Sequence, residues 1–133
     1  MSLVRRLVPT AALLGLLSGC AMNQPLYNWK GYDGVLYNHY KHPENHDEFV
    51  RKLEYIIQQA ETEGRKVPPG IYAEYGYALI EGGQPTEAVK AFGKERDLWP
   101  ESRYFMEKMI ANAERMQVRS NRQTVLPAGE EAK

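Results

Sequence analysis

The residues best suited to metal or acid–base chemistry gather in one short stretch of the sequence. His39, His42 and His46 are the only histidines and fall within eight residues, with carboxylates nearby. Zinc sites use imidazole and carboxylate donors, but Pro43 interrupts any helix that would place the three rings on one face. We therefore expect a solvated loop without a metal, and a His42→Ala substitution should remove no activity.

Other catalytic patterns are missing from the sequence. It contains no nucleophile elbow, no HExxH, no phosphate-binding Walker sequence and no dinucleotide-binding glycine motif. Glu44, Asp47 and Glu48 fall on the polar surface of an expected helix, where solvation and capping are the usual roles of carboxylates. We therefore expect no catalytic residue, no cofactor, no small-molecule substrate and no enzymatic activity.

The composition narrows the class of protein further. The 133 residues carry 17 basic and 17 acidic side chains, so the formal net charge is zero. A nucleic-acid-binding protein needs a basic surplus to neutralise phosphates, and we therefore expect no nucleic-acid partner. A single cysteine excludes an internal disulfide framework, and the length suits one small domain.

The first twenty residues have the three parts of an export signal. Arg5 and Arg6 precede an apolar stretch over residues 7–17, and Ser18 and Gly19 lead to the single cysteine, Cys20. The apolar stretch is much shorter than the roughly 20 residues that a membrane-spanning helix needs. We therefore expect residues 1–19 to be a signal peptide that is cleaved.

The tetrapeptide Leu17-Ser18-Gly19-Cys20 resembles the lipobox of bacterial lipoproteins. In that family the thiol receives a diacylglyceryl group, cleavage follows before the cysteine, and the freed amine is acylated. The resemblance implies that Cys20 is the lipid-attachment residue, and two or more acyl chains anchor a protein stably in a membrane. Ala21 in place of Asp implies the outer membrane, on its periplasmic face. The alternatives for Cys20 are an ordinary signal-peptidase site or a buried thiol.

Processing at Cys20 changes the charge balance. Loss of Arg5 and Arg6 leaves 15 basic and 17 acidic residues, a net charge of −2. That net charge does not attract the protein to anionic lipid, so we expect the anchor to hold it at the membrane. Residues 20–28 then form a lipidated tether.

Helical periodicity dominates the rest of the chain. Apolar residues recur at helical spacing between residues 44 and 63 and between residues 103 and 118. Clusters of Pro and Gly separate the segments, and no segment alternates as a strand would. The side chains expected on the apolar faces are Phe49, Leu53, Ile56, Ile57 and Ala60 in the first segment, and Phe105, Met106, Met109, Ile110, Ala113 and Met116 in the second.

Residues 69–102 resemble a tetratricopeptide repeat, a pair of antiparallel helices 34 residues long. The resemblance implies that Gly76 and Ala88 lie where the two helices cross most closely and that Pro100 ends the second helix. Glu95 departs from the usual Ala, which puts close packing of a following repeat in doubt. The positions that carry the resemblance are Tyr72, Tyr75, Gly76, Leu79, Gly83, Ala88, Phe92 and Pro100.

One repeat cannot bury its own apolar face, so neighbouring helices must cover it. We expect residues 31–40 and 44–63 to form a degenerate upstream hairpin and residues 103–118 to form a closing helix. The predicted fold is therefore all-α, with about five helices in antiparallel, tetratricopeptide-like hairpins over residues 29–118. Residues 119–133 are polar and predict a disordered tail.

Aromatic residues are concentrated just ahead of the first predicted helix and within it. Five aromatic rings lie in a region with few aliphatic residues: Tyr27, Trp29, Tyr32, Tyr37 and Tyr40. Two interpretations remain open: the rings form the core of the first hairpin, or some line a groove for a peptide, a partner subunit or a glycan. Tyr72 and Tyr75 are further candidates for contact with a partner.

The order of these features resembles a small family of uncharacterised Gram-negative outer-membrane lipoproteins. The resemblance covers nearly all of residues 20–118 and is carried by YNW-x-GYDGVLYNHYK, the amphipathic helix after it and the single Pro-ended repeat. Genes of that family tend to lie beside those of other lipoproteins, including relatives of the curli secretion channel. The resemblance therefore implies a protein partner in the envelope.

Two functions of different classes follow from these observations. The first is a lipid-anchored, non-enzymatic helical-repeat adaptor or assembly factor for an outer-membrane or periplasmic protein complex, with a secretion-channel-like lipoprotein as one implied partner. The alternative is a lipoprotein that contacts glycan or peptidoglycan through the Tyr/Trp cluster. Sedimentation with purified cell wall distinguishes the two.

Overall fold

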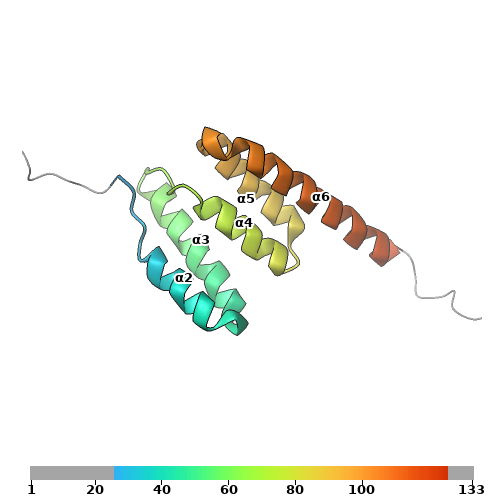
Figure 1. Cartoon of the computed structure of the whole chain (residues 1–133), viewed down its shortest axis with the longest axis horizontal. Helices are drawn as coiled ribbons and strands as arrows, with labels where there is room; N and C mark the ends of the chain where they lie inside the picture. The colour runs from blue at the N-terminus through green and yellow to red at the C-terminus, as the bar shows by residue number, and fades with distance from the viewer. Residues whose placement is uncertain (1–25, 126–133) are drawn as a thin grey trace, which may run out of the picture.

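The computed structural model describes residues 26–125, which fold into α-helices and connecting turns (Figure 1). The predicted signal peptide, Cys20 and most of the predicted tether fall at residues 1–25, outside the described residues, as do residues 126–133 of the predicted tail. Five α-helices and two short 3₁₀ turns lie within the described range: α2 (Tyr32–Lys41), η2 (Pro43–Asn45), α3 (His46–Thr62), α4 (Ile71–Glu81), α5 (Pro85–Leu98), η3 (Pro100–Ser102) and α6 (Arg103–Val125).

Successive helices pack side by side as antiparallel neighbours, so the chain forms a row of hairpins (Figure 1). The described residues contain no strand, and the all-α prediction is confirmed. Pro43 opens η2 and Pro100 opens η3, each just after a helix has ended. Proline has no backbone N–H and fits the first turn of a new helix better than the interior of an old one.

α3 supplies one wall of the core. Phe49, Leu53, Ile56, Ile57 and Ala60 are all buried, as their helical spacing predicts. Leu53 and Phe49 pack with Ala78 of α4, while the other end of α3 packs with the segment that leads into α4. The predicted apolar face of this helix is confirmed.

The α4–α5 hairpin is held by one very close approach. A Cβ atom placed on Gly76 would lie 2.6 Å from Cε1 of Phe92, so no larger residue fits without moving the ring. Phe92 and Ala88 are fully buried beside Leu79 in the cluster that α6 closes with Met106 and Ala113. Gly76 therefore lies at the predicted close crossing, Ala88 is buried, and α5 ends just before Pro100, as expected.

Glu95 has a structural role that its departure from Ala did not reveal. Its side chain is fully buried on α5, and its Oε1 accepts a 2.7 Å hydrogen bond from the backbone N–H of Gly70 and a 3.4 Å bond from the hydroxyl of Ser102. Gly70 is the N-cap residue of α4 and has no capping side chain of its own. Glu95 therefore caps α4 from the next helix, and α6 still packs closely against α5.

α6 differs from its prediction in length and in burial. It continues to Val125 instead of ending at Val118, because no Pro or Gly interrupts it before Pro127 and propagation of a formed helix needs no further nucleation. The predicted disordered tail is therefore wrong for residues 119–125. Phe105 and Met116 are exposed, since at 100° per residue both point well away from the line of Met106 and Ala113.

Candidate partner-binding surface

The chain enters α2 through a sharp backbone turn that glycine makes possible. Lys30 and Gly31 both have positive φ, 47° and 76°, and Tyr32 donates its backbone N–H to the carbonyl oxygen of Trp29 at 2.9 Å. Glycine adopts such an angle without a steric penalty, whereas Lys30 adopts its positive φ at an energetic cost. The turn fixes where α2 begins and places Trp29 beside Tyr32, with ring centroids 5.9 Å apart.

α2 is the most weakly buried helix of the hairpin row. None of its ten residues is fully buried, and its attachment to the core is made by the half-buried Tyr32, Val35 and His39. A helix this short gains little stability from its backbone alone and depends on packing. α2 therefore retains apolar surface that no other described part of the chain covers.

That uncovered surface consists of Leu36, Tyr37 and Tyr40, which we call the α2 aromatic face. The three side chains are 41%, 64% and 80% exposed. The ammonium group of Lys41 lies 5.7 Å from the ring centroid of Tyr37 and 6.0 Å from that of Tyr40. Exposed Tyr rings beside a cation form the kind of surface that is enriched at protein interfaces.

The other predicted aromatic residues divide between core and surface. Tyr32 is half-buried, and burial together with the nearby carboxylate of Glu74 raises its pKa. Trp29 is partly exposed and packs edge-on against Tyr27, which in turn packs edge-on against the buried Trp99. The N-terminal half of the cluster packs on the domain, as the core interpretation expects, and its C-terminal half faces solvent.

Tyr72 and Tyr75 are packing residues of α4. Tyr72 is buried and donates its hydroxyl to Oε1 of Glu61 at 2.6 Å, and its pKa is raised first by burial and then by this carboxylate. Tyr75 packs against all three core clusters and is only partly accessible. The structure thus places Tyr72 and Tyr75 in the packing between α3, α4 and α5 and apart from the α2 aromatic face.

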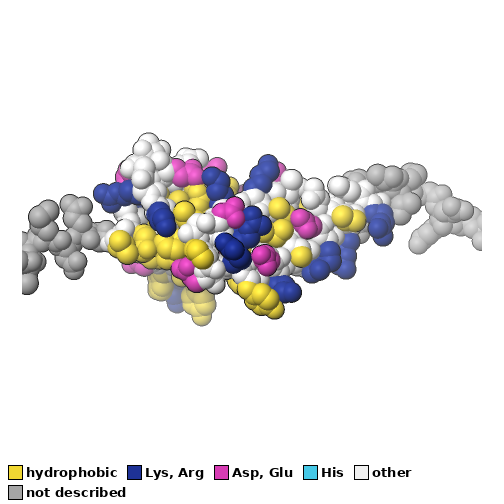
Figure 2. All heavy atoms as spheres, turned by 90° about the horizontal axis from the view of Figure 1, so that it is seen from above, with side chains coloured by type: hydrophobic (Ala, Val, Ile, Leu, Met, Phe, Trp, Pro, Cys, Tyr) yellow, Lys and Arg dark blue, Asp and Glu magenta, His cyan; other side chains and the backbone are white. Residues whose placement is uncertain are grey.

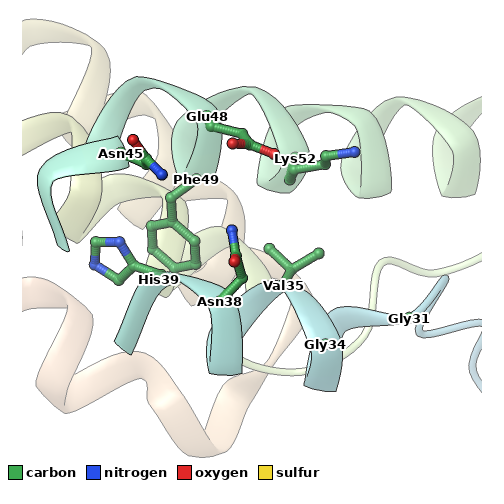
Figure 3. Close-up of a pocket in the computed structure, with 9 residues that line it drawn as sticks. All are labelled: Gly31, Gly34, Val35, Asn38, His39, Asn45, Glu48, Phe49 and Lys52. Carbon is green, nitrogen blue, oxygen red and sulfur yellow. The ribbon is translucent and has the colours of Figure 1, made fainter. Parts of the chain in front are cut away.

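A pocket of about 300 Å³ lies between α2 and α3 (Figure 3). Figure 3 shows the amide of Asn38 on α2 facing α3, where Glu48 and Lys52 lie, and the ring of His39 stacked on Phe49. The two rings are parallel, with an interplanar angle of 6° and centroids 4.0 Å apart. The residues that line the pocket are Gly31, Gly34, Val35, Asn38, His39, Asn45, Glu48, Phe49 and Lys52.

The histidines do not form a solvated loop, and that prediction is wrong for two of them. The α2–α3 hairpin brings His39 and His46 together with ring centroids 6.2 Å apart, and Nδ1 of His39 and Nε2 of His46 are buried without a hydrogen-bond partner. Only His42 is well exposed; its Nδ1 lies 3.3 Å from Oε1 of Glu44. Folding back at Pro43, which interrupts the helix as expected, places the flanking rings against each other.

The described residues, 26–125, contain neither a metal-binding cluster nor a membrane-spanning helix. No group of three or more His, Cys, Asp or Glu side chains in this range is arranged to hold a metal ion. No helix in the same range is both long enough and apolar enough to cross a membrane. Besides the α2 aromatic face and the α2–α3 pocket, this part of the chain carries charged helix surfaces and further pockets, one of which, of about 380 Å³, is lined in part by Tyr72 and Tyr75.

The sequence missed the positioning of the pocket and of the Glu95 cap. The pocket depends on which side chains face each other across the α2–α3 hairpin, and it is also lined by Gly34, where an added Cβ would meet nothing within 4 Å. Both features join residues on separate helices. Only the Glu95 cap had a signal in the sequence, because Glu95 occupies a position of the 34-residue repeat where Ala is usual.

The arrangement defines a class of protein: a small all-α domain of consecutive antiparallel hairpins whose first helix exposes aromatic side chains. Residues 26–109 match the family model described as a domain of unknown function, DUF4810, and the chain belongs to this family. The match includes α2 to α5 and the start of α6. Neither the comparison with curated proteins nor that with solved structures gave a match.

Proposed function

We propose that this protein is a lipid-anchored envelope protein that acts as a non-enzymatic adaptor or assembly factor for an outer-membrane or periplasmic protein complex. The observation that carries the adaptor role is the α2 aromatic face, on a helix with no fully buried residue. A partner that covers Leu36, Tyr37 and Tyr40 would bury apolar area and give α2 the packing it lacks.

The helical-hairpin architecture supports this role. The 34-residue frame over residues 69–102 contains α4, α5 and η3, and its Gly76 lies against Phe92 at the helix crossing. A tetratricopeptide-like repeat is commonly a protein-binding scaffold. We therefore propose a tetratricopeptide-like scaffold that presents α2 to the partner, for which a secretion-channel-like lipoprotein is our first candidate.

The test compares two pairs of tyrosines with similar exposure. We expect Tyr37→Ala/Tyr40→Ala to reduce recovery of the partner in pull-downs of the lipidated protein by at least tenfold, with little change in stability. Tyr55→Ala/Tyr77→Ala is the matched control, since Tyr55 and Tyr77 are each 52% exposed on α3 and α4. An equal loss in both pairs, or recovery of only lipid and abundant porins, would contradict the adaptor role.

The anchor is tested separately. Cys20→Ser should abolish fatty-acid labelling and leave an uncleaved or soluble precursor, because no thiol remains to accept the diacylglyceryl group. Inner- and outer-membrane fractions of the wild-type protein then test the proposed outer-membrane location. Unchanged membrane association and unchanged mass of the Cys20→Ser protein would contradict the lipoprotein proposal.

A glycan or peptidoglycan contact is the second candidate function, and the α2–α3 pocket favours it. The side chains of Asn38, Asn45, Glu48 and Lys52 combine amide, carboxylate and ammonium groups at one opening, which suits the hydroxyl and amide groups of a glycan. Sedimentation with purified cell wall should then depend on Asn38 and Asn45. Loss of sedimentation in Asn38→Ala/Asn45→Ala, with partner recovery intact, would favour this candidate over the adaptor.

A further inference from the structure

Charge is unevenly distributed along the described chain. Residues 26–102 contain nine basic and 13 acidic side chains, a net of −4, whereas α6, residues 103–125, contains five basic and two acidic side chains, a net of +3. Figure 2 shows dark-blue basic side chains along the whole described surface, and toward its C-terminal end few magenta acidic side chains accompany them. The near-neutral net charge of the described chain is therefore the sum of a cationic helix, α6, and an acidic remainder of the domain.

The basic residues of α6 share one side of the helix. At 100° per residue, Lys108, Arg115, Arg119 and Arg122 fall within an arc of about 60°, and all four are exposed. We call these four residues the α6 basic face. The buried residues Met106 and Ala113 point to the opposite side, and the ion pairs formed among the described residues involve none of the three arginines.

Exposed apolar side chains flank the α6 basic face. Tyr104 and Phe105 are 74% and 61% exposed near the start of α6, and Met116 and Val118 are also exposed farther along. The ammonium group of Lys108 lies 5.2 Å from the ring centroid of Tyr104. The C-terminal part of α6 projects beyond the neighbouring helices (Figure 1), so a flat surface can reach this face.

We propose that the α6 basic face docks on an anionic phospholipid surface. Charge complementarity selects lipid headgroup phosphates as the ligand, because four clustered cations with flanking aromatic and aliphatic side chains form the composition of an interfacial helix. The contact would orient the domain on the membrane and does not require the lipid anchor. The proposal departs from the expectation that net charge does not attract the protein to anionic lipid, because it rests on the local charge of α6.

The test uses the full chain with Cys20→Ser and Asn112→Cys, so that a fluorophore is attached at one exposed position beside the basic face. The readout is protection of this fluorophore from a water-soluble quencher on vesicles of phosphatidylcholine with or without phosphatidylglycerol. Because the readout is local to α6, membrane binding through residues 1–19 does not imitate it. Because Cys20 is absent, the result is independent of the proposed lipidation.

We expect protection only on vesicles that contain phosphatidylglycerol, decreasing as salt is raised. Arg115→Gln/Arg119→Gln/Arg122→Gln should weaken the apparent vesicle affinity about 100-fold, since each basic residue near such a surface contributes roughly fivefold. The matched control, Arg51→Gln/Arg65→Gln/Lys90→Gln, removes the same charge from exposed positions on other elements and should change affinity less than about threefold.

Three results would overturn the proposal. The first is equal quenching on both kinds of vesicle, and the second is equal weakening by the two triple variants when circular dichroism shows both to be folded. The third is stronger protection by polyglutamate than by the anionic vesicles, which would assign the face to an acidic protein. None of these results bears on acylation of Cys20 or on the α2 aromatic face.

Discussion

Replacement of Glu95 by Ala tests the cap that joins α5 to the start of α4. The substitution removes the carboxylate oxygen that accepts the 2.7 Å bond from Gly70 and leaves that N–H group without its capping partner. A hydrogen bond to a charged group contributes about 1.5–3 kcal/mol to stability. Removing the buried carboxylate of Glu95 also removes its desolvation cost, which offsets part of the loss. We expect Glu95→Ala to lower the free energy of unfolding by about 2 kcal/mol.

Thermal unfolding monitored by circular dichroism measures this effect. For a domain of about 100 residues, 2 kcal/mol corresponds to a decrease in Tm of roughly 8–16 °C. Glu114→Ala is the control, because Glu114 is exposed on α6 and surface substitutions usually change stability by less than about 0.5 kcal/mol. A Glu95→Ala protein as stable as the control would refute the assigned cap.

The pH dependence of Glu95→Gln tests the electrostatics of the same site. Burial raises the pKa of Glu95 above its ordinary value, although the N–H groups at the start of α4 act in the opposite direction. A carboxyl with a raised folded-state pKa contributes stability that is fully present below the unfolded-state pKa and is lost as pH rises through the folded-state value. The stability advantage of wild type over Glu95→Gln should therefore shrink as pH rises above about 4.5. An advantage that grows with pH would show that the hydrogen bonds outweigh burial.

Three further predictions concern the packing of the helices. Gly76→Ala should lower the free energy of unfolding by about 1–3 kcal/mol in chemical denaturation, because its Cβ would overlap Phe92. Gly93→Ala has open space around the added Cβ and should raise the free energy of unfolding by about 0.5–1 kcal/mol. Equal effects of the two substitutions would contradict the close crossing of α4 and α5. Tyr72→Phe should lower the free energy of unfolding by about 1 kcal/mol, because the hydrogen bond to Glu61 is lost. Tyr72→Ala and Tyr75→Ala should measurably reduce the helix content seen by circular dichroism. An unchanged spectrum would show that neither is a packing residue. Backbone amides of α2 should exchange with deuterium at least about tenfold faster than those of α4 and α5, because α2 has no fully buried residue; equal protection would show that α2 is covered.

The sequence predicted the helices and the α4–α5 packing well, because both depend on local pattern. Spacing alone identified the buried face of α3, and the frame of residues 69–102 located Gly76 at the crossing. Proline positions gave the helix boundaries, since a missing N–H is a property of the residue itself. The end of α6 was missed because polar composition does not stop a helix that contains no breaker.

The candidate surface could be predicted only in part. Aromatic composition pointed to residues 29–40, but it could not divide Tyr32, which is half-buried, from Tyr37 and Tyr40, which are exposed. That division depends on the angle at which α2 lies against α3 and on the turn at Gly31. The contact between His39 and His46 likewise arises from folding back of the hairpin, which spacing along the chain does not encode.

The central proposal is that the α2 aromatic face binds an envelope protein, and site-specific crosslinking tests it most directly. A photoactivatable phenylalanine analogue in place of Tyr37, in the otherwise native lipidated protein in its own envelope, should crosslink to one specific envelope protein. The same analogue in place of Tyr55, which is similarly exposed on α3, should give little or none of that product. Equal crosslinking from both positions, or crosslinks from Tyr37 to lipid and abundant porins alone, would contradict the proposal.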